Sequence, residues 1–194
     1  MTNIMKILTI LAFSTMLLSA SEFVIDKTHS QVSFKVKHMM ISNVQGTFEE
    51  YDADIEFDTK TMQFTALSAE METKSVDTGI EKRDNHLRSA DFFDAKKNPM
   101  ITFEMKSYKG DKEEGKMDGN LTIRGISKPV TLDVEIGGLI KDPAGIQRLG
   151  FVLESKIKRK DFGLKWNKLL EAGGLAVSET VKLTIEIEAL EEEE

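Results

Sequence analysis

The chain has 194 residues, no cysteine and a formal net charge of −7, from 33 acidic and 26 basic side chains. Such an acidic surface repels nucleic acid, so no nucleic-acid partner is expected, and the absence of cysteine excludes disulfides and thiol chemistry. The length suits one domain with a core of its own.

Residues 1–20 have the pattern of a secretory signal peptide. Lys6 precedes an apolar run over residues 7–18, and the small residues Ser19 and Ala20 follow it. The run is too short to span a bilayer, and it is apolar on every side, which disfavours an amphipathic core helix. We therefore expect cleavage after Ala20, which changes the net charge to −8 because Lys6 is lost, and a periplasmic location.

Alternation with a period of two dominates the rest of the sequence. In residues 31–38 the side chains of Val32, Phe34, Val36 and His38 fall on one face of an extended strand, and polar side chains fall on the other. The same pattern recurs at 53–57, 67–71, 101–105, 117–123, 130–136, 151–157 and 181–187, and residues 44–48 add a further strand. The short connections favour antiparallel neighbours.

The expected fold class is all-β. About eight or nine strongly twisted strands tend to close on themselves, and eight strands leave an interior wide enough for side chains or one slender ligand. We predict a single domain over residues 21–194, a lipocalin-like antiparallel up-and-down barrel with a short helical insertion at one end. A two-sheet sandwich is the main alternative, because alternation does not distinguish it from a barrel.

The insertion lies at residues 75–99, where dense charge interrupts the alternation. Thr78 and Glu81 have the spacing of a capping box, which predicts a short helix over residues 79–87. Asp84 and Arg88 would then lie one turn apart and could pair.

The second half of the insertion carries two adjacent aromatic residues. Ser89 could cap a second short helix that bears Phe92 and Phe93, and Pro99 marks the return to a strand. We expect the whole insertion to lie across one end of the barrel.

The sequence offers little for catalysis, metal binding or a cofactor. The three histidines, His29, His38 and His86, are far apart and lack HExxH spacing or cysteine neighbours, so no metal site is expected. No G-x-S-x-G elbow presents a nucleophilic serine, and no glycine-rich phosphate loop precedes a helix. His38 continues an apolar face, where it is either a bonded core histidine or a polar group facing a ligand.

A resemblance spans essentially the whole chain after the signal peptide. The motifs are D-K-T-H-S-Q-V-S-F-K-V-K-H-M (residues 26–39), V-Q-G-T-F (44–48), S-V-D-T-G-I-E-K-R-D-N-H-L-R-S-A-D-F-F-D (75–94), P-M-I-T-F (99–103), G-N-L-T-I-R-G-I-S-K-P-V-T-L (119–132) and R-K-D-F-G-L (159–164). In this order they resemble the YceI-like family. The resemblance implies a periplasmic lipocalin-like barrel that binds a polyisoprenoid or similar amphiphile, without established catalysis.

The ligand residues follow from this reading. An apolar tunnel would be lined by Phe34, Val36, Phe57, Phe103, Leu121 and Ile123. Its mouth would be closed by Phe92, Phe93 and Trp166, with His38, Arg83, Asp84 and His86 near the ligand's head group. Plain core packing is the alternative for the first six, and Arg83 and Asp84 could instead form a structural pair that holds the insertion.

We therefore expect a carrier, not an enzyme, for a quinone, a prenyl phosphate or a fatty amide or acid. A hydrolase or isomerase acting on such an amphiphile, and an interaction protein without ligand, remain alternatives on the sequence alone. The residues leave open a homodimer and a transient membrane contact. D-G-N-L-T (residues 118–122) also fits an acceptor for bacterial N-glycosylation at Asn120, which a mass shift absent from Asn120→Gln would reveal.

Overall fold

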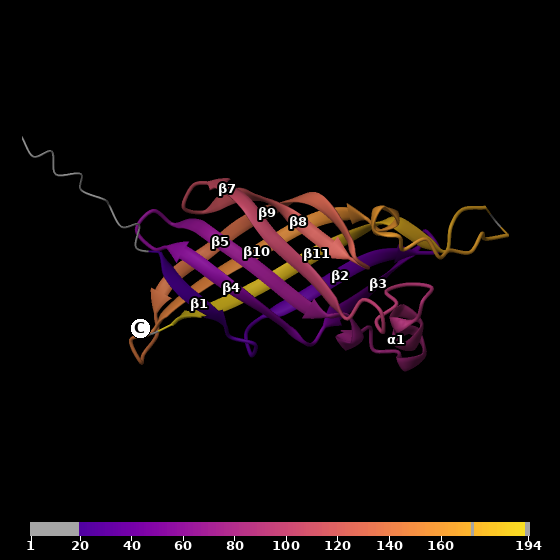
Figure 1. Cartoon of the computed structure of the whole chain (residues 1–194), viewed down its shortest axis with the longest axis horizontal. Helices are drawn as coiled ribbons and strands as arrows, with labels where there is room; N and C mark the ends of the chain where they lie inside the picture. Colours follow the sequence, from indigo (N-terminus) through magenta and orange to yellow (C-terminus); the bar gives the residue numbers. More distant parts are fainter. Residues whose placement is uncertain (1–19, 172, 193–194) are drawn as a thin grey trace, which may run out of the picture.

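The computed structural model describes residues 20–171 and 173–192, most of which form one antiparallel sheet (Figure 1). Residues 1–19 of the expected signal peptide lie outside the described residues. Within the described ranges, none of the helices combines the length and the apolar composition that crossing a bilayer requires.

The sheet contains eleven strand segments, accompanied by one α-helix and two 3₁₀ turns. The strands are β1 (Ser21–Ile25), β2 (Gln31–His38), β3 (Ser42–Phe48), β4 (Tyr51–Asp58), β5 (Gln63–Glu72), β6 (Val76–Asp77), β7 (Met100–Gly110), β8 (Glu114–Ile123), β9 (Ile126–Lys141), β10 (Gln147–Lys158) and β11 (Val177–Glu191). The helical segments are η1 (Thr73–Ser75), α1 (Glu81–Arg88) and η2 (Arg159–Phe162).

The sheet is a closed barrel of eight strands. The ring runs β1-β4-β5-β7-β8-β9-β10-β11 and closes where β11 pairs with β1. Three more segments extend the sheet beyond this ring. β2 pairs with β11 after the bend that follows β1, β3 pairs with β2, and β6 pairs with β3. The predicted up-and-down barrel is therefore confirmed, and the sandwich is excluded because one continuous ladder joins all strands.

One end of the barrel is filled by aromatic side chains. Phe57 packs edge-on against Phe23 at a ring-centroid distance of 6.3 Å and against Phe64 at 5.0 Å. Phe64 in turn contacts Phe151 at 5.0 Å and Tyr108 at 5.3 Å. Because Phe23 and Phe57 are almost fully buried, this aromatic group closes the end of the barrel that lies opposite α1.

The insertion covers the other end, next to the β2–β3 hairpin (Figure 1). The expected capping box is wrong: Ile80 is the N-cap of α1 and makes no side-chain cap. Gly79 has a φ of 77°, so the chain turns before the helix begins, and Thr78 bonds to Asp84 instead.

Two further expectations for the insertion are also wrong. Asp84 does not pair with Arg88, because the Arg88 guanidinium donates to the carbonyl oxygens of Lys74 and Val76, both at 2.7 Å. No second helix follows Ser89, since residues 90–97 form successive turns. The Ser89 hydroxyl donates to the carbonyl of His86 at 2.7 Å and so ends α1.

The tight approach of β8 to β7 gives a stability prediction. A Cβ on Gly119 would contact the Phe103 ring and lie 2.6 Å from the carbonyl oxygen of Glu104. Gly119→Ala should therefore lower the free energy of unfolding by about 1–3 kcal/mol, measured by urea denaturation. Gly150→Ala is the matched control: its Cβ would meet no atom within 4 Å, so a change within about 0.5 kcal/mol is expected. Equal losses in the two variants would contradict the packing explanation.

Candidate functional site

The barrel encloses an apolar cavity of about 330 Å³. This volume is at the small end of the range for ligand pockets, about 300–1,000 Å³, and gives room for one slender chain. Inward-facing side chains of nearly every strand line it, among them Ile55, Leu67, Ile101, Leu132, Leu153, Leu183 and Ile185. The aromatic group around Phe57 and Phe64 closes the far end, so the cavity is a blind tunnel.

The structure brings eleven of the thirteen predicted site residues to this cavity. They are Phe34, Val36, His38, Arg83, His86, Phe92, Phe93, Phe103, Leu121, Ile123 and Trp166. The inward phase of the alternating strands placed the aliphatic and aromatic members, because successive side chains of a strand point to opposite faces. That these residues contact a ligand stays a prediction.

Phe57 and Asp84 do not line the cavity. The prediction that Phe57 lines the tunnel is therefore corrected, whereas a place for Asp84 near a head group stays a prediction. Phe57 lies beyond an irregularity in the β4–β5 register, between Glu56 and Phe57, and belongs to the aromatic group at the closed end. Asp84 is 4% exposed, and its carboxylate accepts hydrogen bonds from the Thr78 backbone N–H at 2.9 Å and from the Thr78 hydroxyl.

Arg83 completes this network from the same helix. Its Nε donates to the Thr78 hydroxyl oxygen at 2.7 Å, and its Nη2 donates to the Thr78 carbonyl at 2.9 Å. Arg83 and Asp84 are therefore joined through Thr78 and fasten α1 to the segment before it. Arg83 also lines the cavity, so it both holds α1 in place and belongs to the site.

Three aromatic rings from the insertion and from the loop after η2 form the cover of the cavity. His86 stacks edge-on against Phe92 at 5.0 Å and against Trp166 at 4.9 Å, and Phe92 and Trp166 are 5.2 Å apart. His86 Nε2 lies 3.0 Å from a carboxylate oxygen of Asp91, outside the cavity. Because the lining residues His38, Arg83 and His86 lie at this end, opposite the aromatic group around Phe57 and Phe64, we assign the mouth of the tunnel to it.

Arg159 also lines the cavity near the mouth, and the sequence reasoning missed it. It is 3% exposed and donates to the carbonyl oxygens of Leu164 at 2.6 Å, Trp166 at 2.9 Å, Ser178 at 2.9 Å and Val177 at 3.4 Å. Burial lowers the pKa of Arg159, and the nearby charge of Glu179 opposes this shift. The signal was present, because residue 159 continues the inward phase of residues 151, 153, 155 and 157.

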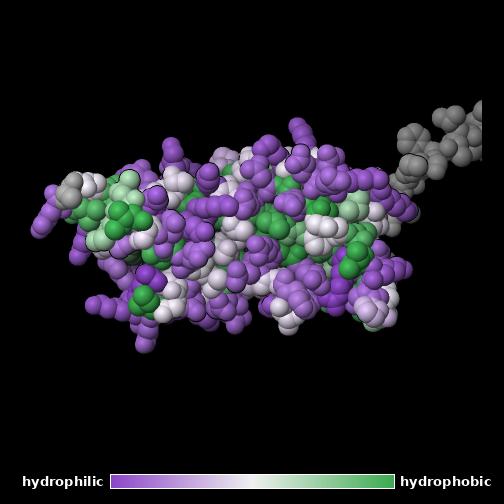
Figure 2. Space-filling model, turned by 180° about the vertical axis from the view of Figure 1, so that it is seen from behind, coloured by the Kyte–Doolittle hydropathy of each residue, from purple (hydrophilic) through white to green (hydrophobic). Residues whose placement is uncertain are grey.

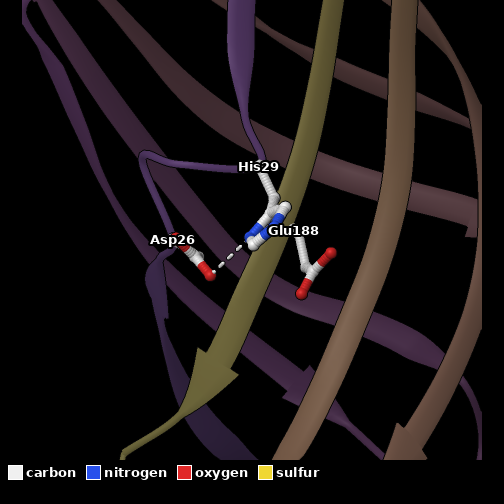
Figure 3. A group of neighbouring side chains, drawn as sticks. All are labelled: Asp26, His29 and Glu188. Carbon is white, nitrogen blue, oxygen red and sulfur yellow. Dashed lines mark hydrogen bonds and ion pairs between the residues drawn. The ribbon is translucent and has the colours of Figure 1, made fainter.

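A separate polar cluster lies at the closed end of the barrel (Figure 3). Asp26 and His29 come from the bend between β1 and β2, and Glu188 comes from β11; their ligand-type atoms lie within 4.8 Å of one another. His29 Nδ1 is 2.9 Å from Asp26, and this hydrogen bond is the main reason why the pKa of His29 is raised. Hydrogen bonds from Thr28 are the first cause that lowers the pKa of Asp26, followed by the bond with His29.

Arg148 contacts the carboxylates of this cluster. Its guanidinium lies 3.0 Å from Asp26, 3.0 Å from Asp142 and close to Glu188. A fixed positive charge therefore already neutralises the carboxylates that a cation would need, which disfavours a metal at this position. The cluster ties the β1–β2 bend and the β9–β10 turn to the end of β11.

Comparison with known proteins agrees with the fold. The model of the YceI-like domain matches residues 23–189. The chain belongs to the YceI-like family. The Protein YceI of Salmonella newport, a member by name, is 39% identical over 184 residues, which cover 94% of this chain and 93% of that protein. A UPF0312 protein of Staphylococcus epidermidis is 38% identical over 163 residues, covering 84% of this chain and 93% of the relative.

Solved structures of similar chains have the same architecture. The YceI protein of Campylobacter jejuni shares 45% identity with a TM-score of 0.71, covering 87% of this chain and 97% of that one. A domain of Saccharophagus degradans, described as polyisoprenoid-binding, shares 16% identity with a TM-score of 0.64 over 90% of this chain and all of the other. The second similarity shows the fold alone.

Removal of the buried arginine should loosen the loop at the mouth. Arg159→Met removes the donor to the carbonyl oxygens of Leu164, Trp166 and Ser178, whereas the Val177 carbonyl keeps its bond from the Asn167 amide. We therefore expect a loss of about 2–4 kcal/mol in the free energy of unfolding, measured in urea with Trp166 fluorescence as the signal. Lys156→Met, on the exposed outer face of β10 just before η2, is the control and should cost less than about 0.5 kcal/mol. A similar, small loss in both variants would show that the carbonyls do not depend on Arg159.

The Asp26–His29 contact predicts a pH dependence of stability. Because the pKa of His29 is raised above its ordinary value of 6.5, its protonation stabilises the fold below that pH, and this contribution is lost as the pH rises through the raised value. The difference in unfolding free energy between wild type and His29→Gln should thus be largest below pH 6.5 and shrink in alkali. In an Asp26→Asn background the same substitution should show a much smaller trend, because only the charge of Glu188 then raises the pKa of His29. A trend of the same size in that background would refute the pairing.

Proposed function

We propose that this protein is a periplasmic binding or carrier protein for a long-chain amphiphile, with a polyisoprenoid such as a quinone or prenyl phosphate, or a fatty amide or acid, as the ligand. The observation that carries the proposal is the blind apolar tunnel of about 330 Å³ inside the barrel. A packed core leaves few voids larger than a water molecule, so a cavity of this size indicates a space for a ligand.

The energetics suit a hydrocarbon ligand. Each methylene transferred from water into the tunnel contributes roughly 0.8 kcal/mol, so the tail alone supplies ample affinity. The sum is limited by the practical ceiling of about −20 kcal/mol and by the costs of ordering and desolvation. Polar groups at the mouth, His38, Arg83 and His86, would then orient the head group and contribute less to affinity.

The comparisons support a binding role at the level of the fold. The Saccharophagus degradans domain with this architecture is described as polyisoprenoid-binding, and the family match covers the strands that build the tunnel. The periplasmic location rests on residues 1–20, whose sequence has the signal-peptide pattern.

Narrowing the tunnel provides the test. Ala69 on β5 lines the cavity, whereas the preceding residue, Ser68, points outward and is exposed. Mass spectrometry of an organic extract from gently purified protein should find a long-chain molecule in wild type and in Ser68→Phe. Ala69→Phe should carry about tenfold less, equivalent to ~1.4 kcal/mol of binding free energy, while circular dichroism confirms that it is folded.

The other outcomes separate the alternatives. A wild-type protein that carries no such molecule and takes up none on incubation would exclude the carrier function. Turnover of the extracted molecule, lost in His38→Ala or His86→Ala, would instead identify an enzyme. Retention of the full ligand content by folded Ala69→Phe would place the ligand outside the tunnel.

A further inference from the structure

Two loops beside the mouth expose large apolar side chains to solvent. Met40 and Ile41, in the turn between β2 and β3, are 59% and 85% exposed, and Leu169, in the loop after η2, is 84% exposed. With Met39 these residues form what we call the apolar tip. Figure 2 shows hydrophobic side chains gathered at the left-hand end of the molecule, where the loop after η2 lies.

The apolar tip is held in place by its base. The Met39 N–H donates to the Ala176 carbonyl at 2.8 Å, and the Ala176 N–H donates to the Lys168 carbonyl at 2.9 Å, so the two loops are joined. The Asn167 side chain bonds both the N–H and the carbonyl of Val177, at 3.0 and 2.7 Å. The exposure of the tip is therefore built into the fold, and no described contact draws these side chains inward.

The apolar tip is continuous with the cavity. His38, which precedes Met39, and Val177, which follows Ala176, both line the tunnel and pair with each other in the sheet. Trp166 lines the tunnel three residues before Leu169. A hydrocarbon chain that leaves the mouth would thus meet apolar side chains before it meets water.

Charge around the apolar tip is opposite to that of the whole chain. The exposed residues Lys165 and Lys168 in the loop after η2 and Lys37 at the end of β2 flank it. Glu171 is the acid within the described part of that loop, and the nearby Glu179 is paired with Lys160. The local balance is therefore positive in a chain whose net charge is −7. A second copy of the chain would bring the same lysines against these, whereas a surface with negative head groups and an apolar interior matches both features.

We propose that the apolar tip inserts into the surface of a bilayer containing anionic lipid and so docks the mouth of the tunnel on the membrane. This inference rests on the proposed function in one respect: a ligand that is insoluble in water must be taken from, or delivered to, a membrane. The flanking lysines would lie at the level of the head groups, and the barrel would extend from the bilayer surface with its closed end farthest from the membrane.

Vesicle flotation tests the docking without reference to cargo. Wild type should float with phosphatidylcholine vesicles that contain phosphatidylglycerol, less with phosphatidylcholine alone, and less at high salt. The double variant Ile41→Asp/Leu169→Asp should lower the partition coefficient by about tenfold or more, because it places charge where apolar contact is needed. Phosphatidylcholine with brominated acyl chains, mixed into the vesicles, should quench Trp166, the one tryptophan of the chain, in wild type only.

Two matched variants make the result specific. Ile140→Asp changes a side chain that is 66% exposed at the opposite end of the barrel, beside Arg148, and should leave flotation unchanged. Lys165→Glu/Lys168→Glu should abolish the preference for phosphatidylglycerol. Equal losses in Ile140→Asp and in the tip variant, or no flotation of wild type with either vesicle, would overturn the proposal.

The failure of docking can be told apart from failure of the carrier function. The Ile41→Asp/Leu169→Asp protein should still take up a long-chain isoprenoid alcohol supplied in detergent, because the tunnel is intact. Flotation that depends on the tip, with no uptake by either protein, would keep the docking and reject the cargo. Uptake by both proteins, together with equal flotation of wild type and the tip variant, would keep the cargo and reject the docking.

Discussion

The closure of the sheet through β11 is the constraint on which the rest of the structure depends. β11 pairs with β10 along one edge and with β1 and β2 along the other, so no strand of the ring is left with a free edge. One strand can serve both β1 and β2 because the chain bends between them at residues 26–30. Closure separates an interior from an outer surface, and the alternation of each strand then divides its side chains between the two.

Different interactions stabilise the two ends of the barrel. At the closed end, aromatic rings fill the interior and Arg148 joins three carboxylates around the bend. At the mouth, arginines bond mainly to backbone carbonyls: Arg88 to η1 and β6, Arg124 to the turns after α1, and Arg159 to the loop after η2. Irregular backbone lacks ladder partners, so these guanidinium groups satisfy it where the sheet cannot. The charged side chains of residues 75–99 thus hold the cover of the tunnel in place, and the Asp84 carboxylate is hydrogen-bonded to Thr78.

The site was predictable wherever it lies on regular strands. Phe34, Val36, Phe103, Leu121 and Ile123 were found because the period of two gives each residue a face, whatever its partners are. The prediction for Phe57 failed because a register irregularity lies beside it, and its ring packs with Phe23 and Phe64 at the closed end of the barrel. Arg159 was missed because a charged residue at an inward position contradicts the expected pattern, although its position in the alternation was correct.

By itself the sequence determined the fold class, the family and the inner faces of most strands, since these follow from local alternation and from motifs. It predicted about eight or nine strands and missed β1 and β6, two of the eleven segments, because both are too short to show alternation. It did not determine how the insertion is fastened, because the partners of Thr78, Arg83 and Arg88 are chosen by chain segments that only the folded barrel brings together. Asn120 illustrates the same limit. Its acceptor motif is visible in the sequence, but the structure pairs it with Glu104 on one side and Pro129 on the other, inside a finished sheet. Only tertiary structure decided that the interior stays partly empty, because the volume inside a closed barrel depends on how all eight strands tilt and pack together.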